Sequence, residues 1–275
     1  MTTDMRSGLT RRVAVHALML SLSLVAVFPV LWMVMSSLKP ENEILSVRPW
    51  PLAPSLDNYV FVLTQIPMLR MLANTTIVAG ATAVLQVVTG LLAAYAFVRW
   101  RFRLSKVAHG LISLSWLVPF QIVMIPNYVL ASRLGLLDTL SGLVIPNAAA
   151  AFAVLLLHNA MRSFPREVVE AARMDGAGSW RILWEVVVPN LRATIAAVAI
   201  LAFISAWNEY FWPLLLSRRM ENSVVQMGLQ MFMTQEGNLW GPLMAAATLA
   251  SLPVLAIYLI LQRQVIDAFM KSGIR

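Results

Sequence analysis

The chain of 275 residues contains no cysteine and few charged residues. Without cysteine the chain has no disulfide bond, no thiolate metal site and no thiol redox chemistry. Asp, Glu, Lys and Arg make up 12% of the residues, about half the share found in a soluble domain. By contrast, 59% of the residues are hydrophobic and the mean hydropathy is +0.74. This composition excludes an ordinary soluble domain and indicates a membrane protein.

The charged residues are placed so that six long stretches remain almost free of them. Each stretch exceeds the ~20 residues that a helix needs to cross a hydrocarbon layer about 30 Å thick. The stretches are Val13–Leu38, Met71–Val98, Val107–Ser132, Thr139–Met161, Ala193–Ser217 (with Glu209 inside it) and Gly237–Gln262. Lipid offers no hydrogen-bond partners to the backbone, so each stretch should be helical. The sequence therefore predicts an all-α, polytopic membrane protein with six transmembrane helices.

The arginine and lysine residues are distributed unevenly between the two sides of the predicted membrane domain. If the N-terminus is cytoplasmic, the inner segments hold fifteen of the 21 Lys and Arg residues. This positive-inside bias predicts that both termini are cytoplasmic. The predicted parts are a cytoplasmic N-terminal segment 1–12, a membrane domain 13–262 with a cytoplasmic loop 162–189, and a cytoplasmic tail 263–275. The net charge of +8 is explained by orientation and requires no nucleic acid partner.

The first span is preceded by arginines, as a secretory signal peptide would be. It is longer than the apolar core of about 7–15 residues that such signals carry. The segment after it, Ser36 to Pro40, has no small-x-small cleavage pattern. We therefore expect the first span to be a retained membrane helix.

Prolines and polar residues interrupt the third and fourth spans, and polar residues lie near the outer end of the fifth. Pro119 and Pro126 fall in the third span and Pro146 in the fourth. Broken helices at membrane depth line protein or a water-filled path, which is where a solute would pass. The candidate solute-pathway residues are Gln121, Asn127, Tyr128, Asn147, Asn208 and Glu209. Two interpretations remain open, because the kinks could serve packing alone and Glu209 could be an interfacial glutamate in a fifth span that runs to about Leu216.

The longest inner loop has the local chemistry of two helices joined by a turn. Pro165 suits a helix start, and Glu167 and Glu170 face the positive end of the helix dipole. Gly176 can adopt the left-handed conformation that ends a helix, and Ser179 can cap the next one. The loop therefore predicts a short helix, a glycine turn and a second helix, a shape suited to a groove on a partner protein.

This loop resembles the signature loop of the permease subunits of binding-protein-dependent ABC importers. The matching residues are Glu170-Ala171-Ala172, Gly176, Val186, Val188 and Pro189. The segment Ala206–Leu214 is similar to the carbohydrate-uptake subfamily, whose familiar member is the maltose-type permease. Shorter matches are Ser37-Leu38-Lys39, Asn58-Tyr59 and Asn74-Thr75. The resemblance covers residues 13–275, which is nearly the whole chain.

The resemblance implies a function and a set of partners. A permease of this kind imports a sugar, oligosaccharide, amino sugar or glycerol-phosphate ester across the bacterial inner membrane. An extracytoplasmic solute-binding protein would deliver the solute, and a second, different permease subunit would complete the pore within the membrane lipid. The loop would be a coupling helix seated on a separate ATPase dimer, which would bind ATP and Mg. The coupling residues so implied are Glu170, Ala171, Ala172, Asp175 and Gly176.

ATP hydrolysis by this chain itself is not expected. A phosphate-binding P-loop requires a lysine directly after a glycine. The three lysines are Lys39, Lys106 and Lys271, and none follows a glycine. We therefore expect a chain that is not an enzyme and that carries no cofactor of its own.

Two other classes of membrane protein fit the sequence less well than an importer permease does. A proton-coupled secondary transporter usually carries buried acidic or histidine relays, yet Asp138 is the only acidic residue between Asp57 and Glu167. An intramembrane enzyme would need a nucleophile with its base, or a metal cluster. The three histidines, at positions 16, 109 and 158, are expected to be scattered without pairing. The sequence thus predicts no catalytic residue and no metal site.

Overall fold

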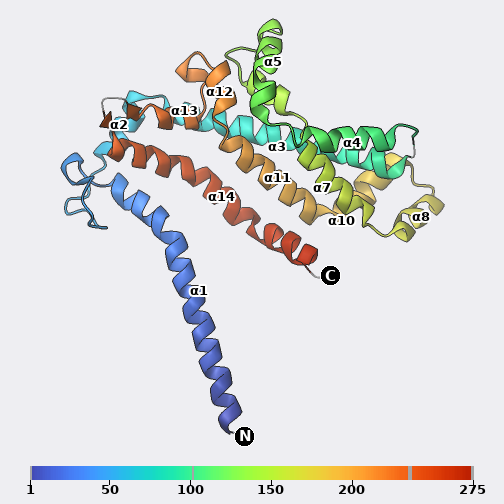
Figure 1. Cartoon of the computed structure of the whole chain (residues 1–275), viewed down its shortest axis with the longest axis horizontal. Helices are drawn as coiled ribbons and strands as arrows, with labels where there is room; N and C mark the ends of the chain where they lie inside the picture. The colour runs from blue at the N-terminus through green and yellow to red at the C-terminus, as the bar shows by residue number, and fades with distance from the viewer. Residues whose placement is uncertain (1, 101, 235–236, 274–275) are drawn as a thin grey trace. The chain divides into compact units, whose positions relative to one another are not determined.

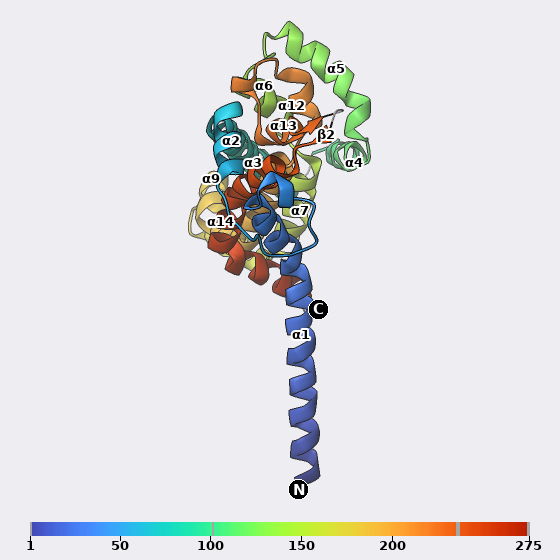
Figure 2. The same ribbon diagram turned by 90° about the vertical axis from the view of Figure 1, so that its left-hand side faces the viewer.

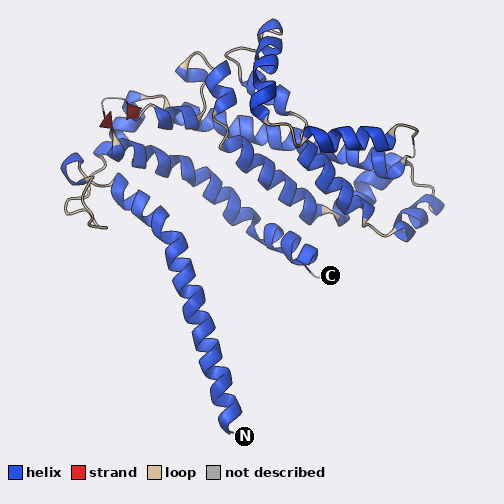
Figure 3. Ribbon diagram, in the orientation of Figure 1, coloured by secondary structure: helices blue, strands red, loops and turns tan. Residues whose placement is uncertain are grey.

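The protein is known from a computed structural model that describes the backbone of residues 2–100, 102–234 and 237–273 (Figure 1). Side chains are described within residues 12–262, apart from 13, 101, 234–236, 238 and 261. The chain divides into two compact units, residues 1–66 with 229–251, and residues 67–228 with 252–275. Helices make up most of the described chain (Figure 3). The prediction of an all-α fold is therefore confirmed.

The first unit holds a long helix, two short helical elements and a hairpin. Its elements are α1 (Thr2–Ser37), the 3-10 helix η1 (Glu41–Glu43), α2 (Asp57–Gln65), β1 (Met233–Thr234), β2 (Gly237–Asn238) and the first part of α14 (Trp240–Gly273). The two strands are antiparallel, with Met233 opposite Asn238 and Thr234 opposite Gly237. The boundary between the units falls inside α14, after Ser251.

The second unit holds the remaining helices and the last part of α14. They are α3 (Met68–Arg99), α4 (Ser105–Ser115), α5 (Phe120–Arg133), α6 (Leu140–Val144), the 3-10 helix η2 (Ile145–Asn147), α7 (Ala151–Arg162), α8 (Arg166–Met174), α9 (Ser179–Arg181), the π-helix η3 (Ile182–Val187), α10 (Val188–Asn190), α11 (Arg192–Trp207), α12 (Phe211–Leu216), the 3-10 helix η4 (Met220–Asn222) and α13 (Val225–Gln230). Helices α3, α7 and α11 pack against one another, and α3 and α7 lie alongside each other in both views (Figures 1 and 2).

Six candidate membrane spans are present in the described part of the chain. Three are single helices, Ala14–Ser37, Met68–Arg99 and Trp240–Ile260. Three are bent pairs, Ser105–Ser115 with Phe120–Arg133 (100°), Leu140–Asn147 with Ala151–Arg162 (44°) and Ser179–Asn190 with Arg192–Trp207 (81°). The predicted six spans are confirmed. The third and fourth are broken as the prolines indicated, and the fifth is broken as well, which was not predicted.

The breaks do not all fall where the sequence placed them. In the third span the helix stops before Pro119, which caps α5, while Pro126 lies inside α5. The fifth span was predicted to reach about Leu216, and this was wrong because α11 ends at Trp207. The physical reason is Pro213, which has no N–H to give to the carbonyl of residue 209 and clashes with it in a continuous helix.

The ends of the chain are more helical than the predicted segments suggested. Helix α1 begins at Thr2, so the N-terminal segment 1–12 is continuous with the first span. Helix α14 continues through Gly273, so most of the tail 263–275 is helical as well. Ile274 and Arg275 lie outside the described residues.

A polar cluster within the first unit joins the end of α1 to α2. The Ser37 hydroxyl lies 2.7 Å from the Tyr59 hydroxyl, and the Asn58 amide donates to the carbonyls of Ser37 (2.9 Å) and Lys39 (2.8 Å). Lys39 is fully buried and its Nζ donates to the carbonyl of Ser46 at 3.1 Å. These contacts account for the two short motifs, at 37–39 and 58–59, that stood out in the sequence.

A second polar cluster, within the second unit, fixes the segment after η4 onto α3. The Asn74 amide donates to the carbonyls of Glu221 (2.8 Å) and Ser223 (3.0 Å). The Thr75 hydroxyl accepts from the N–H of Val225 at 2.8 Å. Because Asn74 and Thr75 are buried, these bonds replace water for backbone groups that would otherwise be unpaired.

Asp138 joins the turn before α6 to the segment after α12. Its backbone N–H donates to the carbonyl of Leu216 (2.9 Å), and its Oδ1 accepts from the N–H groups of Arg218 (3.0 Å) and Arg219 (3.1 Å). Its Oδ2 lies 2.6 Å from Nε of Arg219, and its carbonyl accepts from Asn222 at 2.9 Å. The residue has a positive φ of 58°, which Asp and Asn tolerate better than most residues. The hydrogen bond from the Arg219 guanidinium, aided by the backbone N–H groups, lowers the pKa of the Asp138 carboxyl from an ordinary 3.8 to about 2.

Replacing Asp138 should reveal a pH-dependent part of the stability. Because the folded pKa lies below the unfolded one, the stabilisation is fully present above about pH 4 and is lost as the pH falls through about 2. We expect Asp138→Asn, which keeps the size and tolerates the positive φ, to lower the apparent Tm by a few degrees near pH 7. The difference from the wild type should shrink toward pH 2, as measured by thermal unfolding in detergent.

Glu221→Gln is the matched control for this experiment. Glu221 forms an exposed pair with Arg70 at 3.6 Å, and exposed pairs contribute little. A difference between Asp138→Asn and wild type that stays constant from pH 7 to pH 2 would contradict the role assigned to the ionised carboxylate.

Candidate functional site

Helix α8 ends in two backbone hydrogen bonds that reverse the chain. The N–H of Ala177 donates to the carbonyl of Ala172 (3.0 Å), and the N–H of Gly176 donates to that of Arg173 (2.9 Å). This is the Schellman arrangement, in which the glycine adopts a left-handed conformation, here with φ of 79°. The predicted helix, glycine turn and second helix are confirmed.

The second helix of the loop begins without the predicted side-chain cap. Gly178 occupies the N-cap position and Ser179 is the first helical residue, so the assignment of Ser179 as the cap was wrong. Ser179 contributes through its backbone instead, because its carbonyl accepts a 2.8 Å hydrogen bond from the hydroxyl of Tyr95 on α3. This bond ties the start of the second helix to the longest helix of the unit.

The two faces of α8 have different surroundings. Val169 and Ala172 pack against a buried cluster built from α3, α7, the π-helix and α11. The cluster consists of Leu91, Ala94, Tyr95, Ala153, Leu157, Met161, Ile182, Leu183, Val187 and Val198. On the other face Ala171 is exposed, and Met174 is 89% exposed. Helix α8 is therefore packed on one face, and the other presents Ala171 and Met174 together with the exposed Glu167.

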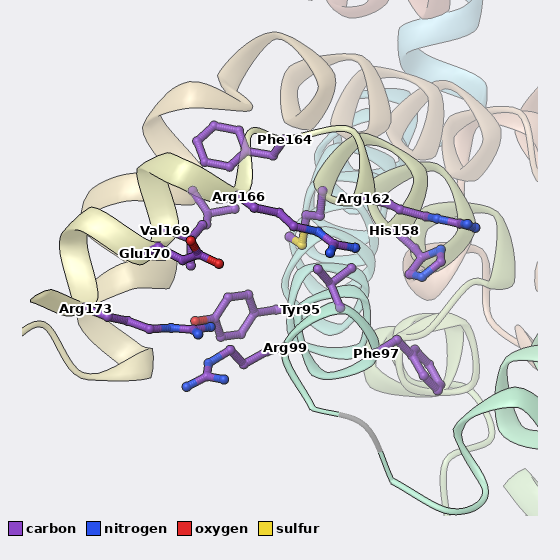
Figure 4. A pocket seen from close by; sticks show the side chains of 13 residues that line it. Tyr95, Phe97, Arg99, His158, Arg162, Phe164, Arg166, Val169, Glu170 and Arg173 are labelled. Atoms are coloured by element: carbon purple, nitrogen blue, oxygen red, sulfur yellow. The ribbon is translucent and has the colours of Figure 1, made fainter.

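The predicted coupling residues occupy different positions on this loop. Ala171, Asp175 and Gly176 are exposed, whereas Ala172 packs on the buried cluster. Glu170 is exposed and also lines a pocket between α8 and the ends of α3 and α7 (Figure 4). The five residues thus lie on one short segment, but only some of them face away from the helix bundle.

A small cavity lies on the other side of the buried cluster, where the bent spans meet α3. Its volume is about 70 Å³, room for only a few water molecules. Of the candidate pathway residues, Asn147 and Glu209 line it. The Gln86 amide, also on its wall, donates to the carbonyl of Asn147 at 2.8 Å. The side chain of Glu209 accepts a hydrogen bond from the N–H of Trp212 at 3.2 Å, in the first turn of α12.

Three polar residues of this cavity, Thr82, Gln86 and Ser205, were not among the predicted pathway residues. Thr82 is 2% exposed, and its hydroxyl has no hydrogen-bond partner in the described part of the chain. Thr82 and Gln86 are four residues apart on α3 and therefore share one face of it. That spacing of polar residues within an apolar span was the signal that could have found them.

The other candidate pathway residues do not line the cavity. Gln121, Asn127 and Tyr128 belong to α5, and Tyr128 packs against a second buried cluster around Leu143 and Trp212. The side chain of Asn208 donates to the carbonyl of Ile204 at 2.8 Å, which closes the end of α11. The structure therefore brings together two of the six candidates and gives Asn208 a structural contact.

Two of the three histidines form a pair, contrary to the expectation that they are scattered. Nε2 of His109 lies 3.2 Å from Nδ1 of His158, and Phe97 packs its ring edge against both. The pairing could not be seen in the sequence because the partners are 49 residues apart on α4 and α7. Within the residues that the structure describes, no group of three or more His, Asp or Glu side chains could hold a metal ion.

Comparison with known proteins decides the family. Residues 86–270, two thirds of the chain, match the family described as "binding-protein-dependent transport system inner membrane component". The chain belongs to this family. The permease is 30% identical over 269 residues to the sn-glycerol-3-phosphate transport system permease protein UgpE of Rhizobium meliloti (strain 1021), covering 94% of this chain and 95% of that one. It is 28% identical over 272 residues to the lactose transport system permease protein LacG of Rhizobium radiobacter, covering 99% of both.

The fold of the permease is also found in a solved transporter. A chain in the crystal structure of a bacterial ABC transporter involved in the import of the acidic polysaccharide alginate matches with a TM-score of 0.80 and 26% identity, covering 94% of this chain and 97% of that one. The resemblance noted in the sequence is confirmed: the permease is an inner membrane component of the sugar and glycerol-phosphate ABC importer family. Both of these relatives are transport system permease proteins.

The wall of the cavity should depend on a glycine in α6. A Cβ built on Gly142 would lie 2.1 Å from the carbonyl oxygen of Leu136, and the carbonyl of Gly142 itself accepts from Nε1 of Trp212 at 3.1 Å. We expect Gly142→Ala to displace this wall and to lower the apparent Tm by several degrees, since overpacking costs about 1–3 kcal/mol. Thermal unfolding in detergent would measure the change.

Gly80→Ala provides the matched control because a Cβ at Gly80 meets nothing within 4 Å. This variant should unfold at or slightly above the wild-type temperature. If both alanine variants were equally stable, the close approach at Gly142 would not be a structural requirement.

Proposed function

We propose that this permease imports a sugar or a related small polar solute, such as an oligosaccharide, an amino sugar or a glycerol-phosphate ester, and that α8 couples it to a separate ATPase. The observation that carries the proposal is the α8 segment, a short helix packed on one face, ended by a glycine turn and exposed on the other. An exposed helix face with small and apolar side chains fits a groove of a partner protein. The proposed coupling residues are Glu170, Ala171, Ala172, Asp175 and Gly176.

The packing of α8 supports a role in transmitting movement. Val169, Ala172 and Ala177 contact the same buried cluster as the ends of α3 and α7. The Tyr95–Ser179 hydrogen bond adds a polar link between α3 and the helix after the turn. A partner that displaced α8 would therefore act directly on the membrane spans. We propose that ATP and Mg are bound by this partner and not by the permease.

The lining of the cavity supports the proposal that the solute carries many hydroxyl groups and is neutral or weakly charged. Its polar lining consists of hydroxyl and amide groups with Glu209 as the one carboxylate, a set that hydrogen-bonds hydroxyl groups. At about 70 Å³ it is too small for a sugar, so the solute would pass between this chain and a second, different permease subunit. We propose that Asn147 and Glu209 face this route, and that Gln121, Asn127, Tyr128 and Asn208 lie along it only if the second subunit contacts α5 and the end of α11.

The remaining partners follow from the exposed apolar helices. Helix α1 exposes apolar side chains along residues 14–30, and α4 and α5 also expose many of theirs. Such surfaces need lipid or another membrane helix. We propose that the second permease and lipid cover them, that an extracytoplasmic solute-binding protein delivers the solute, and that both termini are cytoplasmic.

The glycine turn gives a sharp test of coupling. Gly176→Ala adds only a methyl group in open space, so its cost of about 1 kcal/mol comes from the left-handed φ of 79°. We expect a several-fold loss of solute-stimulated ATP hydrolysis in the reconstituted transporter. Glu170→Arg, which reverses the charge at the edge of the proposed contact, should also reduce it.

Gly178→Ala is the control, because Gly178 has a φ of −68° and equally open space. Its coupling should match that of the wild type. Normal coupling in both Gly176→Ala and Glu170→Arg, with intact assembly, would refute the assignment of α8 as the coupling helix.

The absence of native cysteine allows a direct test of orientation. We expect a thiol introduced by Met174→Cys to react with a membrane-impermeant maleimide only when the cytoplasmic face is accessible, as in inverted vesicles. Met174 is 89% exposed, so the reagent can reach it. Leu45→Cys, at a position that is 81% exposed after the first span, should react in intact spheroplasts. The reverse pattern would overturn both the orientation and the coupling role.

A further inference from the structure

A pocket of about 390 Å³ lies between α8 and the C-terminal ends of α3 and α7 (Figure 4). It is separate from the proposed solute cavity, with no lining residue in common. Its volume falls within the ~300–1,000 Å³ range of small-molecule sites. Among its lining residues, the proposed function uses only Glu170.

The pocket concentrates positive charge. Four arginines line it, Arg99 from α3, Arg162 from α7, and Arg166 and Arg173 from α8, against the single carboxylate of Glu170. In Figure 4 Arg173 reaches from α8 toward Tyr95, and Arg99 and Arg173 both interact electrostatically with the Tyr95 hydroxyl. Like charges around one pocket repel one another, and an anion bound in the pocket would offset this repulsion.

These arginines lack carboxylate partners. In the described part of the chain the ion pairs involve Arg70, Arg181 and Arg219, and none involves an arginine of this pocket. The Nε of Arg99 is buried without any hydrogen-bond partner among the described residues. A buried donor of this kind indicates a missing acceptor.

Ordinary helix chemistry explains only part of the cluster. Arg99 and Arg162 are the last residues of α3 and α7, where the helix dipole favours a cation. Arg166 is the first residue of α8, where the dipole disfavours one. Its position beside three other arginines therefore needs a different reason.

Apart from Tyr95 and His158, the rest of the lining is apolar. Phe97, Met161, Phe164 and Val187 contribute hydrocarbon surface beside the guanidinium groups. The pocket lies where two membrane-spanning segments end. A ligand that carries a phosphate and can tolerate an apolar wall fits this combination, because guanidinium groups bind phosphate oxygens in pairs of hydrogen bonds.

We propose that this pocket binds a phosphate-bearing anion through Arg99, Arg162, Arg166 and Arg173. The phosphate belongs either to the headgroup of an anionic phospholipid or to a soluble phosphate. A bound phosphate bridges α8 to the ends of α3 and α7 and so stabilises their packing.

The test uses the full-length permease in two arms. In the first, nanodiscs contain phosphatidylglycerol and phosphatidylcholine, and native mass spectrometry counts the lipid retained on the protein. In the second, inorganic phosphate is titrated against the protein in phosphatidylcholine nanodiscs at constant ionic strength, and the shift in Tm is recorded. Arg99→Gln and Arg162→Gln should weaken binding about ten-fold or more, since hydrogen bonds to charged groups are the strong ones.

Arg103→Gln is the matched control, because Arg103 follows Arg99 by four residues, is exposed and does not line the pocket. Should Arg99→Gln fail to fold, Arg162→Lys keeps the charge, loses the paired geometry and should bind with intermediate strength. If the pocket variants, but not the control, lose retained phosphatidylglycerol, the proposal is supported with a lipid ligand. If the pocket variants, but not the control, lose the phosphate-induced Tm shift, it is supported with a soluble ligand. If neither probe binds, or if Arg103→Gln weakens binding as much as the pocket variants, the proposal is wrong.

Discussion

A break in a membrane helix leaves backbone N–H and C=O groups that lipid cannot hydrogen-bond, and the whole structure depends on how these groups are satisfied. At two breaks and at the end of α11 the same solution recurs. Asn147, Asn190 and Asn208 each donate to the carbonyl of the residue four positions earlier, at 3.0, 2.7 and 2.8 Å. At the break in the third span, Ser115 donates to the carbonyl three residues earlier at 2.7 Å. Short polar side chains thus give carbonyl groups a hydrogen-bond donor where the helices end or bend. The carbonyl of Ile204 also accepts from the backbone N–H of Asn208 at 3.1 Å.

This requirement bears on the two interpretations of the polar residues within the spans, and both stay predictions. Asn208 closes a helix end and does not line the cavity, so its contact favours packing. Asn147 closes a helix end and also lines the cavity. Glu209 accepts a hydrogen bond from the first turn of α12 and lines the same cavity. A polar residue at a bend is therefore not by itself evidence of solute contact. Whether the same residue also lines the cavity has to be known.

The fold was predictable from the sequence as far as local physics reaches. The six spans follow from charge-free length, and the end of α8 follows from the freedom of Gly176. The position of Pro213 could have ended the fifth span at Trp207, had its effect on the carbonyl of residue 209 been considered. Bend angles were beyond reach, because they depend on packing between helices.

The candidate site shows where sequence reasoning stops. Thr82 and Gln86 lie in an uninterrupted apolar helix, and they become candidate site residues only because they line the cavity. His109 meets His158 across 49 positions, and Asp138 meets Arg219 across 81. Such pairings depend on tertiary structure, and a single sequence contains no information on which distant residues meet. The arginine pocket is of the same kind, since its members come from three helices.

The bend of 81° between Ser179–Asn190 and Arg192–Trp207 has a mechanical consequence. The first arm contains Ile182 and Leu183, which are fully buried against the same cluster that α8 contacts. Densely packed interiors are nearly incompressible, so a push on α8 is not absorbed locally. Under the proposed coupling role, a displacement of α8 would therefore move the arm Ser179–Asn190 with it and change the angle between this arm and Arg192–Trp207 at Leu191.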